Sequence, residues 1–200
     1  MLDTNTSSIL YDHYKDTCSI VGEAVKTRHR LMVFVLVILG FFAFQGIFPS
    51  VSNMAVKDFL NFKFGLASEV DLSILGNLVW FLLLIFSLRY FQIAIFVERQ
   101  QTYLHEIEDK LNKKLGEEVV TREGKSYLSN YPGFSNWMWS LYTIIFPLLL
   151  LLITVIKIAA ELRNSCIYGW STSLLLNITA FLLLTPSVIL YLITLHKKKR

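Results

Sequence analysis

The sequence predicts an all-α integral membrane protein with four transmembrane helices, and two observations lead to this prediction. First, 54% of the 200 residues are hydrophobic and only 17% are charged, whereas a soluble domain has about 25% charged residues. Second, four apolar stretches approach or exceed the roughly 20 residues that an α-helix needs to cross the hydrocarbon core. The four predicted spans are residues 31–48, 72–97, 137–158 and 174–195.

The placement of lysine and arginine predicts that both termini lie in the cytoplasm. Basic residues collect before the first span, between the second and third spans, and in the tail "HKKKR". The loops on the opposite side hold only Lys57, Lys63 and Arg163. Because positive residues accumulate on the cytoplasmic side of a membrane, we expect the larger polar segments of the chain to lie inside as well.

This topology divides the chain into five segments. They are an amphipathic cytoplasmic helix at 1–30, a first transmembrane hairpin at 31–97, a cytoplasmic helical insertion at 98–136, a second hairpin at 137–195 and a basic tail at 196–200. The excess positive charge lies beside membrane ends, so anionic lipid headgroups are the expected partner and direct nucleic-acid binding is not expected. The predicted headgroup contacts are Lys197, Lys198, Lys199 and Arg200.

The second span is longer than the bilayer requires. Its 26 apolar residues make about 39 Å of α-helix, against a hydrocarbon core of about 30 Å. The helical pattern continues to Leu115, and Gly116 is a natural stop signal. We therefore expect one long helix that leaves the membrane near Arg89 and continues as a cytoplasmic stalk.

The stalk carries an apolar face, which predicts a docking surface for a cytoplasmic protein or for a second copy of the chain. Leucine and isoleucine recur along it at spacings of three and four, as on one side of a helix. The predicted partner or oligomer interface is Phe91, Ile95, Leu104, Ile107, Leu111 and Leu115. The amino-terminal helix is an alternative cover for the residues just below Arg89.

Polar residues inside the spans favour a different function, that of a small ion channel or transporter. Such residues cost free energy in lipid and tend to face a helix partner or a cavity. The candidates are Arg89, Asn77, Asn177, Thr143 and Thr185. Arg89 marks the inner leaflet if the span starts at Leu72. If Trp80 marks the outer interface instead, Arg89 lies at mid-depth, where an oligomer could use it to line an anion-selective pore.

Three further patterns concern the spans and their loops. Pro147 and Pro186 predict bends in the third and fourth spans, and Lys157 with Glu161 predicts a local ion pair at the outer end of the third. Phenylalanines alternate with charged residues in the outer loop between the first two spans, which is typical of a short interfacial segment. "SILGNLVWFLLL" from Ser73 also matches "SLLLNITAFLLL" at seven of twelve positions. Either an internal repeat or chance in a leucine-rich sequence accounts for that match.

No enzyme signature is present in the sequence. A glycine-rich phosphate loop, a His-Glu-x-x-His zinc pair and a Gly-x-Ser-x-Gly elbow are all missing, so no catalytic residue, metal or cofactor is expected. Arg99 and His105 have the loose spacing of the arginine-histidine motif of helical ribonuclease domains. The usual asparagine after the arginine is replaced by Gln100, and the helix extends directly from a membrane span. We therefore predict a protein that is not an enzyme.

The layout of four spans, an amphipathic amino-terminal helix, a helical insertion and a basic tail resembles that of small membrane subunits of bacterial anti-phage defence systems, such as the membrane component of the Kiwa system. The resemblance covers the architecture of the chain and rests on no diagnostic motif, so it assigns no functional residue. It implies an inner-membrane homo-oligomer that senses infection, anchors a soluble effector, or depolarises the membrane when triggered.

Overall fold

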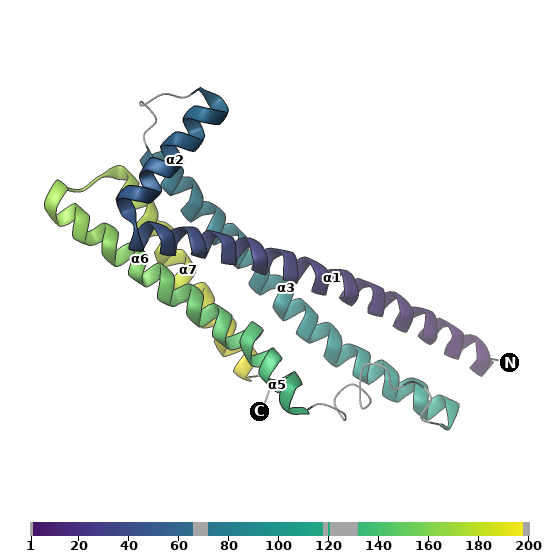
Figure 1. The fold of residues 1–200 in the computed structure, drawn as a ribbon. Helices are drawn as coiled ribbons and strands as arrows, with labels where there is room; N and C mark the ends of the chain where they lie inside the picture. Colours follow the sequence, from purple (N-terminus) through teal and green to yellow (C-terminus); the bar gives the residue numbers. More distant parts are fainter. Residues whose placement is uncertain (1, 66–71, 118–119, 121–131, 198–200) are drawn as a thin grey trace. The chain divides into compact units, whose positions relative to one another are not determined.

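The computed structural model describes residues 2–65, 72–117, 120 and 132–197, and every regular element in these ranges is a helix (Figure 1). The elements are α1 (Leu2–Ile47), α2 (Pro49–Phe64), α3 (Leu72–Leu115), α5 (Pro132–Ser140), η1 (Leu141–Ile145), α6 (Phe146–Tyr168) and α7 (Thr172–Lys197). Four helical segments are long and apolar enough to cross a membrane. The prediction of an all-α, four-span membrane protein is confirmed at this level.

The chain forms two compact units, each with its own core. Unit 1 comprises residues 1–30 and 90–145, and unit 2 comprises residues 31–89 and 146–200. Buried core residues of unit 1 include Tyr14, Val21, Tyr90, Val97, Leu104 and Ile107, and those of unit 2 include Val35, Leu39, Phe42, Trp80, Leu83, Leu150, Leu184 and Val188. The predicted cytoplasmic segments 1–30 and 98–136 fall in unit 1, whereas the basic tail and most of the predicted spans belong to unit 2.

Helix α3 confirms the expectation of one long helix. It runs for 44 residues to Leu115 and ends at Gly116, whose φ of 75° lies in the left-handed region that glycine tolerates. The amide of Gly116 donates to the carbonyl of Asn112 at 3.0 Å, which closes the last turn. Below Arg89, Phe91 and Ala94 are buried, so this stretch of α3 contributes to the core of unit 1.

Helices α1 and α2 are separated by a single residue. Phe48 leaves the helical conformation, with φ of −127° and ψ of 64°, and Pro49 starts α2, where the missing N–H of proline costs nothing. α2 then runs for 16 residues and ends at Gly65 in the left-handed conformation. The short interfacial segment expected from the sequence is thus a full helix, and it exposes large aromatic side chains such as Phe59 and Phe62.

The third predicted span is not one regular α-helix. α5 passes into the π-helical turn η1, and α6 follows from Phe146. Pro147 supplies the physical reason, because it has no N–H for the carbonyl of Thr143 and its ring crowds that carbonyl. A wider π turn relieves this conflict. Pro186, in contrast, lies inside α7.

Candidate functional site

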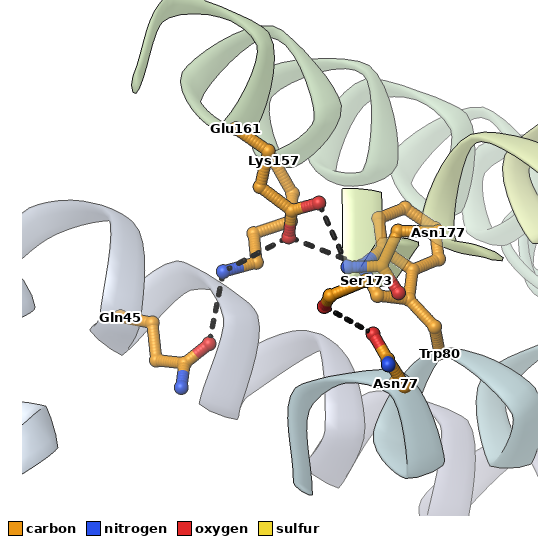
Figure 2. A network of polar contacts seen from close by, with 7 residues as sticks. All are labelled: Gln45, Asn77, Trp80, Lys157, Glu161, Ser173 and Asn177. Atoms are coloured by element: carbon orange, nitrogen blue, oxygen red, sulfur yellow. Dashed lines mark hydrogen bonds and ion pairs between the residues drawn. The ribbon is translucent and has the colours of Figure 1, made fainter. Parts of the chain in front are cut away.

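A cluster of polar side chains joins four helices of unit 2 (Figure 2). It consists of Gln45 from α1, Asn77 and Trp80 from α3, Lys157 and Glu161 from α6, and Ser173 and Asn177 from α7. We call these seven residues the polar cluster. Each helix contributes at least one of them near one end of its predicted span, so the cluster links the four spans at a common level.

The carboxylate of Glu161 is the centre of the polar cluster. Its Oε2 accepts a hydrogen bond of 2.9 Å from the amide nitrogen of Asn177, and its Oε1 accepts one of 3.2 Å from the indole nitrogen of Trp80. The Lys157 Nζ lies 3.4 Å from Oε1. Three donors from three helices therefore compensate a charge that would be costly in an apolar bundle.

Lys157 connects the centre to α1. Its Nζ donates to Oε1 of Gln45 at 3.0 Å and lies 5.5 Å from the centre of the Phe42 ring, a cation–π contact. The side chains of Lys157 and Glu161 are 18% and 19% exposed, respectively. The local pair predicted from the sequence is present, but the sequence missed its contacts to three other helices.

The amide of Asn77 links α3 to α7. It lies 2.6 Å from the hydroxyl of Ser173. With its nitrogen turned toward α7, Asn77 donates to that hydroxyl and to Oδ1 of Asn177 at 3.0 Å. Asn77 and Asn177, both predicted as intramembrane polar residues, therefore meet. They are also equivalent positions in the candidate repeat.

The polar cluster borders an open cavity of about 1050 Å³ in unit 2. The start of α2 forms one side of the cavity, the start of α3 another, and the connection between α6 and α7 a third. Glu161, Ser173 and Asn177 line it directly. A solute could therefore reach the residues that hold the spans together.

The other predicted intramembrane residues do not belong to the cluster. The hydroxyl of Thr143 donates to the carbonyl of Trp139 and that of Thr185 to the carbonyl of Phe181, so each bonds to its own helical segment. Arg89 is exposed on unit 2. It lies twelve positions after Asn77 in α3, about 18 Å along the helix axis.

Most of the leucine and isoleucine stripe that was predicted as a partner interface on α3 is buried within unit 1. Leu104, Ile107 and Leu111 are at most 2% exposed, while Leu115 is 50% exposed. Two bonds join α1 to this part of α3: Tyr14 to Glu108 and His13 to Tyr103. The stripe is thus an internal packing face of unit 1 down to Leu111. A partner protein could reach it only by displacing the segments that cover it.

Two interface residues and the four headgroup residues that were predicted from the sequence remain to be placed. Phe91 is buried in unit 1 and Ile95 is half-buried. The side chain of Lys197, together with Lys198, Lys199 and Arg200, lies outside the described residues. Within the described part of the chain, no group of three His, Cys, Asp or Glu side chains is arranged to hold a metal ion.

Comparison with known proteins adds no assignment: no family model, no curated protein and no solved structure matches the chain. The case for a functional site therefore rests on the residues and their geometry.

Proposed function

We propose that this chain is a non-enzymatic sensor of the bacterial inner membrane, and that the polar cluster is the site at which it detects a solute. The proposal rests on the carboxylate of Glu161. This carboxylate accepts hydrogen bonds from Trp80 and Asn177, pairs with Lys157 and lies beside an open cavity. Ionisable groups in membrane segments are costly and tend to mark functional sites. A solute that altered this one carboxylate would alter the contacts among several spans.

The position of the cluster along the chain supports an outward-facing site. Gln45 lies at the end of the first predicted span and Glu161 just beyond the third, while Asn77 and Ser173 lie at the starts of the second and fourth. All four ends share one side of the membrane in any four-span topology. In the proposed topology, with both termini in the cytoplasm, that side is the outside.

Two of the helices that hold the cluster also suit signal transmission. α1 and α3 each continue without a break from the predicted spans into residues of unit 1. A change in the contacts of Gln45 or Asn77 therefore acts on helices that extend toward the proposed cytoplasmic side. There the sensor would act as a homo-oligomer on a cytoplasmic partner of an anti-phage system, in keeping with the layout of the chain.

Phage challenge tests this proposal. The gene is expressed with its genomic neighbours in a bacterial host, and plaques are counted for the wild type, Glu161→Gln and the control Glu106→Gln, whose side chain is exposed on α3. We expect the wild type and Glu106→Gln to reduce plaque number, and Glu161→Gln to lose protection when the variants are compared at matched protein levels. Full protection by Glu161→Gln would remove the cluster from the sensing role, and no protection by the wild type would remove the defence role.

A small ion channel or transporter is the second candidate, and the meeting of Asn77 and Asn177 favours it. Further along α3, α6 and α7, buried apolar residues such as Leu83, Leu150 and Leu184 outnumber the buried polar residues, which include Ser87 and Thr154. A pathway would therefore have to form between copies of the chain, where Arg89 could line it. In that case, liposomes containing the protein should conduct ions, with a selectivity that changes in Arg89→Gln. Tight vesicles would exclude this function.

A further inference from the structure

The cavity beside the polar cluster has a wall rich in hydroxyl and amide groups. Its volume of about 1050 Å³ is near the upper end of the roughly 300–1,000 Å³ typical of small-molecule sites. Besides the cluster, the polar residues that line it include Ser52, Asn53, Asn164, Ser165 and Ser171. Glycines and alanines also line the cavity.

In the described part of the chain, the wall carries one carboxylate, that of Glu161, and two cations, Lys157 and the exposed Arg163. Glu161 is the only carboxylate among the described residues that line the cavity, and it already accepts from Lys157, Trp80 and Asn177. Lys157 in turn is held by Glu161 and Gln45. Apart from Arg163, the rest of the polar wall consists of amides, which donate and accept, and of serine hydroxyls, which can accept even where, as in Ser52 and Ser165, they already donate to a backbone carbonyl. Such a wall suits a ligand whose groups both donate and accept.

An exposed tryptophan at the cavity is an independent observation. Trp170 lies in the short connection between α6 and α7, lines the cavity and is 72% exposed. The indole gives this cavity an apolar, aromatic face. Its flat face can cover the C–H face of a sugar ring, while the surrounding groups bond the ring hydroxyls.

We infer that this cavity binds a small saccharide, with one sugar ring on the indole of Trp170 and its hydroxyls on the amide and serine wall. A saccharide meets both requirements, because its hydroxyls donate and accept and its ring carries an apolar face. The volume accommodates more than one ring. The inference gives the ligand class for the sensor proposed above and rests on that proposal only for the consequence of binding.

Calorimetric titration of the full chain in lipid nanodiscs tests the inference. The probes are maltose, N-acetylglucosamine and glucuronate, with succinate and phosphate as anions that are not sugars. We expect saturable binding of at least one sugar. Trp170→Ala should weaken it about tenfold, as expected for the loss of one aromatic contact. Trp170→Phe should retain most of the affinity, and the control Trp137→Ala, which changes an exposed tryptophan of unit 1, should bind as the wild type does.

Three results would overturn the inference: no sugar binding at millimolar concentration, binding of succinate or phosphate alone, or sugar binding unchanged in Trp170→Ala. The plaque assay separates this failure from that of the proposed function. Loss of protection in Glu161→Gln without any bound sugar would reject the ligand class and retain the sensor. Sugar binding in a chain that never protects cells would confirm the ligand and reject the sensor.

Discussion

The phenol of Tyr14 donates a hydrogen bond of 2.7 Å to Oε1 of Glu108, a residue 94 positions later in the chain. Both side chains are buried, at 7% and 4% exposure. The bond joins α1 to α3 within unit 1, and it gives a buried carboxylate one of the donors that such a group requires.

Replacing Tyr14 with phenylalanine should lower the free energy of unfolding of unit 1 by about 1–3 kcal/mol, because Glu108 loses a buried hydrogen-bond donor. Thermal unfolding in nanodiscs, followed by hydrogen exchange of α1, measures the change. Tyr11→Phe is the matched control, since Tyr11 is 53% exposed on the same helix. Equal unfolding temperatures for the two variants would count against a contribution of this bond to stability.

The leucine stripe of α3 predicts two different responses to the same substitution. Leu111→Ala should destabilise unit 1 by about 2–5 kcal/mol, because it empties a packed site, whereas Leu115→Ala should change stability by less than about 0.5 kcal/mol. Leu111 is 2% exposed and Leu115 is 50% exposed. Denaturant titration of the two variants measures the difference. Equal losses would mean that the stripe is not an internal packing face.

Removal of the Glu161 carboxylate should destabilise unit 2 in two steps. Glu161→Gln retains an acceptor oxygen and should cost about 1–3 kcal/mol, while Glu161→Ala leaves several donors without their acceptor and should cost more. Unfolding in a graded detergent series measures both. Arg163→Ala, on the exposed side of α6, is the control. An alanine variant as stable as the glutamine variant would show that the donors find other acceptors.

The two cysteines provide a test of the proposed orientation. Cys166 is exposed and Cys18 is half-buried, and the proposed topology places them on opposite sides of the membrane. A membrane-impermeant maleimide added to intact spheroplasts should label Cys18→Ser, which retains Cys166. It should label Cys166→Ser only after permeabilisation. Labelling of Cys18 in intact spheroplasts would reverse the topology.

Local chemistry was sufficient to predict most of the helices. The four apolar lengths, the helix stop at Gly116 and the continuity of α3 follow from composition, glycine geometry and periodicity. The π turn before Pro147 was not predicted, because a proline indicates only that the regular bonding fails at that place. Whether a bend or a π turn replaces it depends on packing around the helix.

The site was harder to predict than the fold. Asn77, Asn177 and the pair of Lys157 and Glu161 were visible as polar groups in apolar surroundings, but Trp80 lies 81 positions from the carboxylate it bonds. No periodicity reports such a distant contact. The stripe at Leu104 and Ile107 illustrates a second limit of sequence analysis. The spacing of apolar residues indicates that a face of the helix is buried, but it does not indicate which segment packs against that face.

The partners of Glu161 enter the chain at very different times during synthesis. Trp80 is made long before α6, Lys157 lies one helical turn before Glu161, and Asn177 follows it by 16 positions. The carboxylate therefore emerges with a cation already on its own helix and an indole N–H in an earlier one. Its last donor, Asn177, is added with α7, the fourth predicted span. The charge of Glu161 is therefore fully compensated only when the bundle is complete.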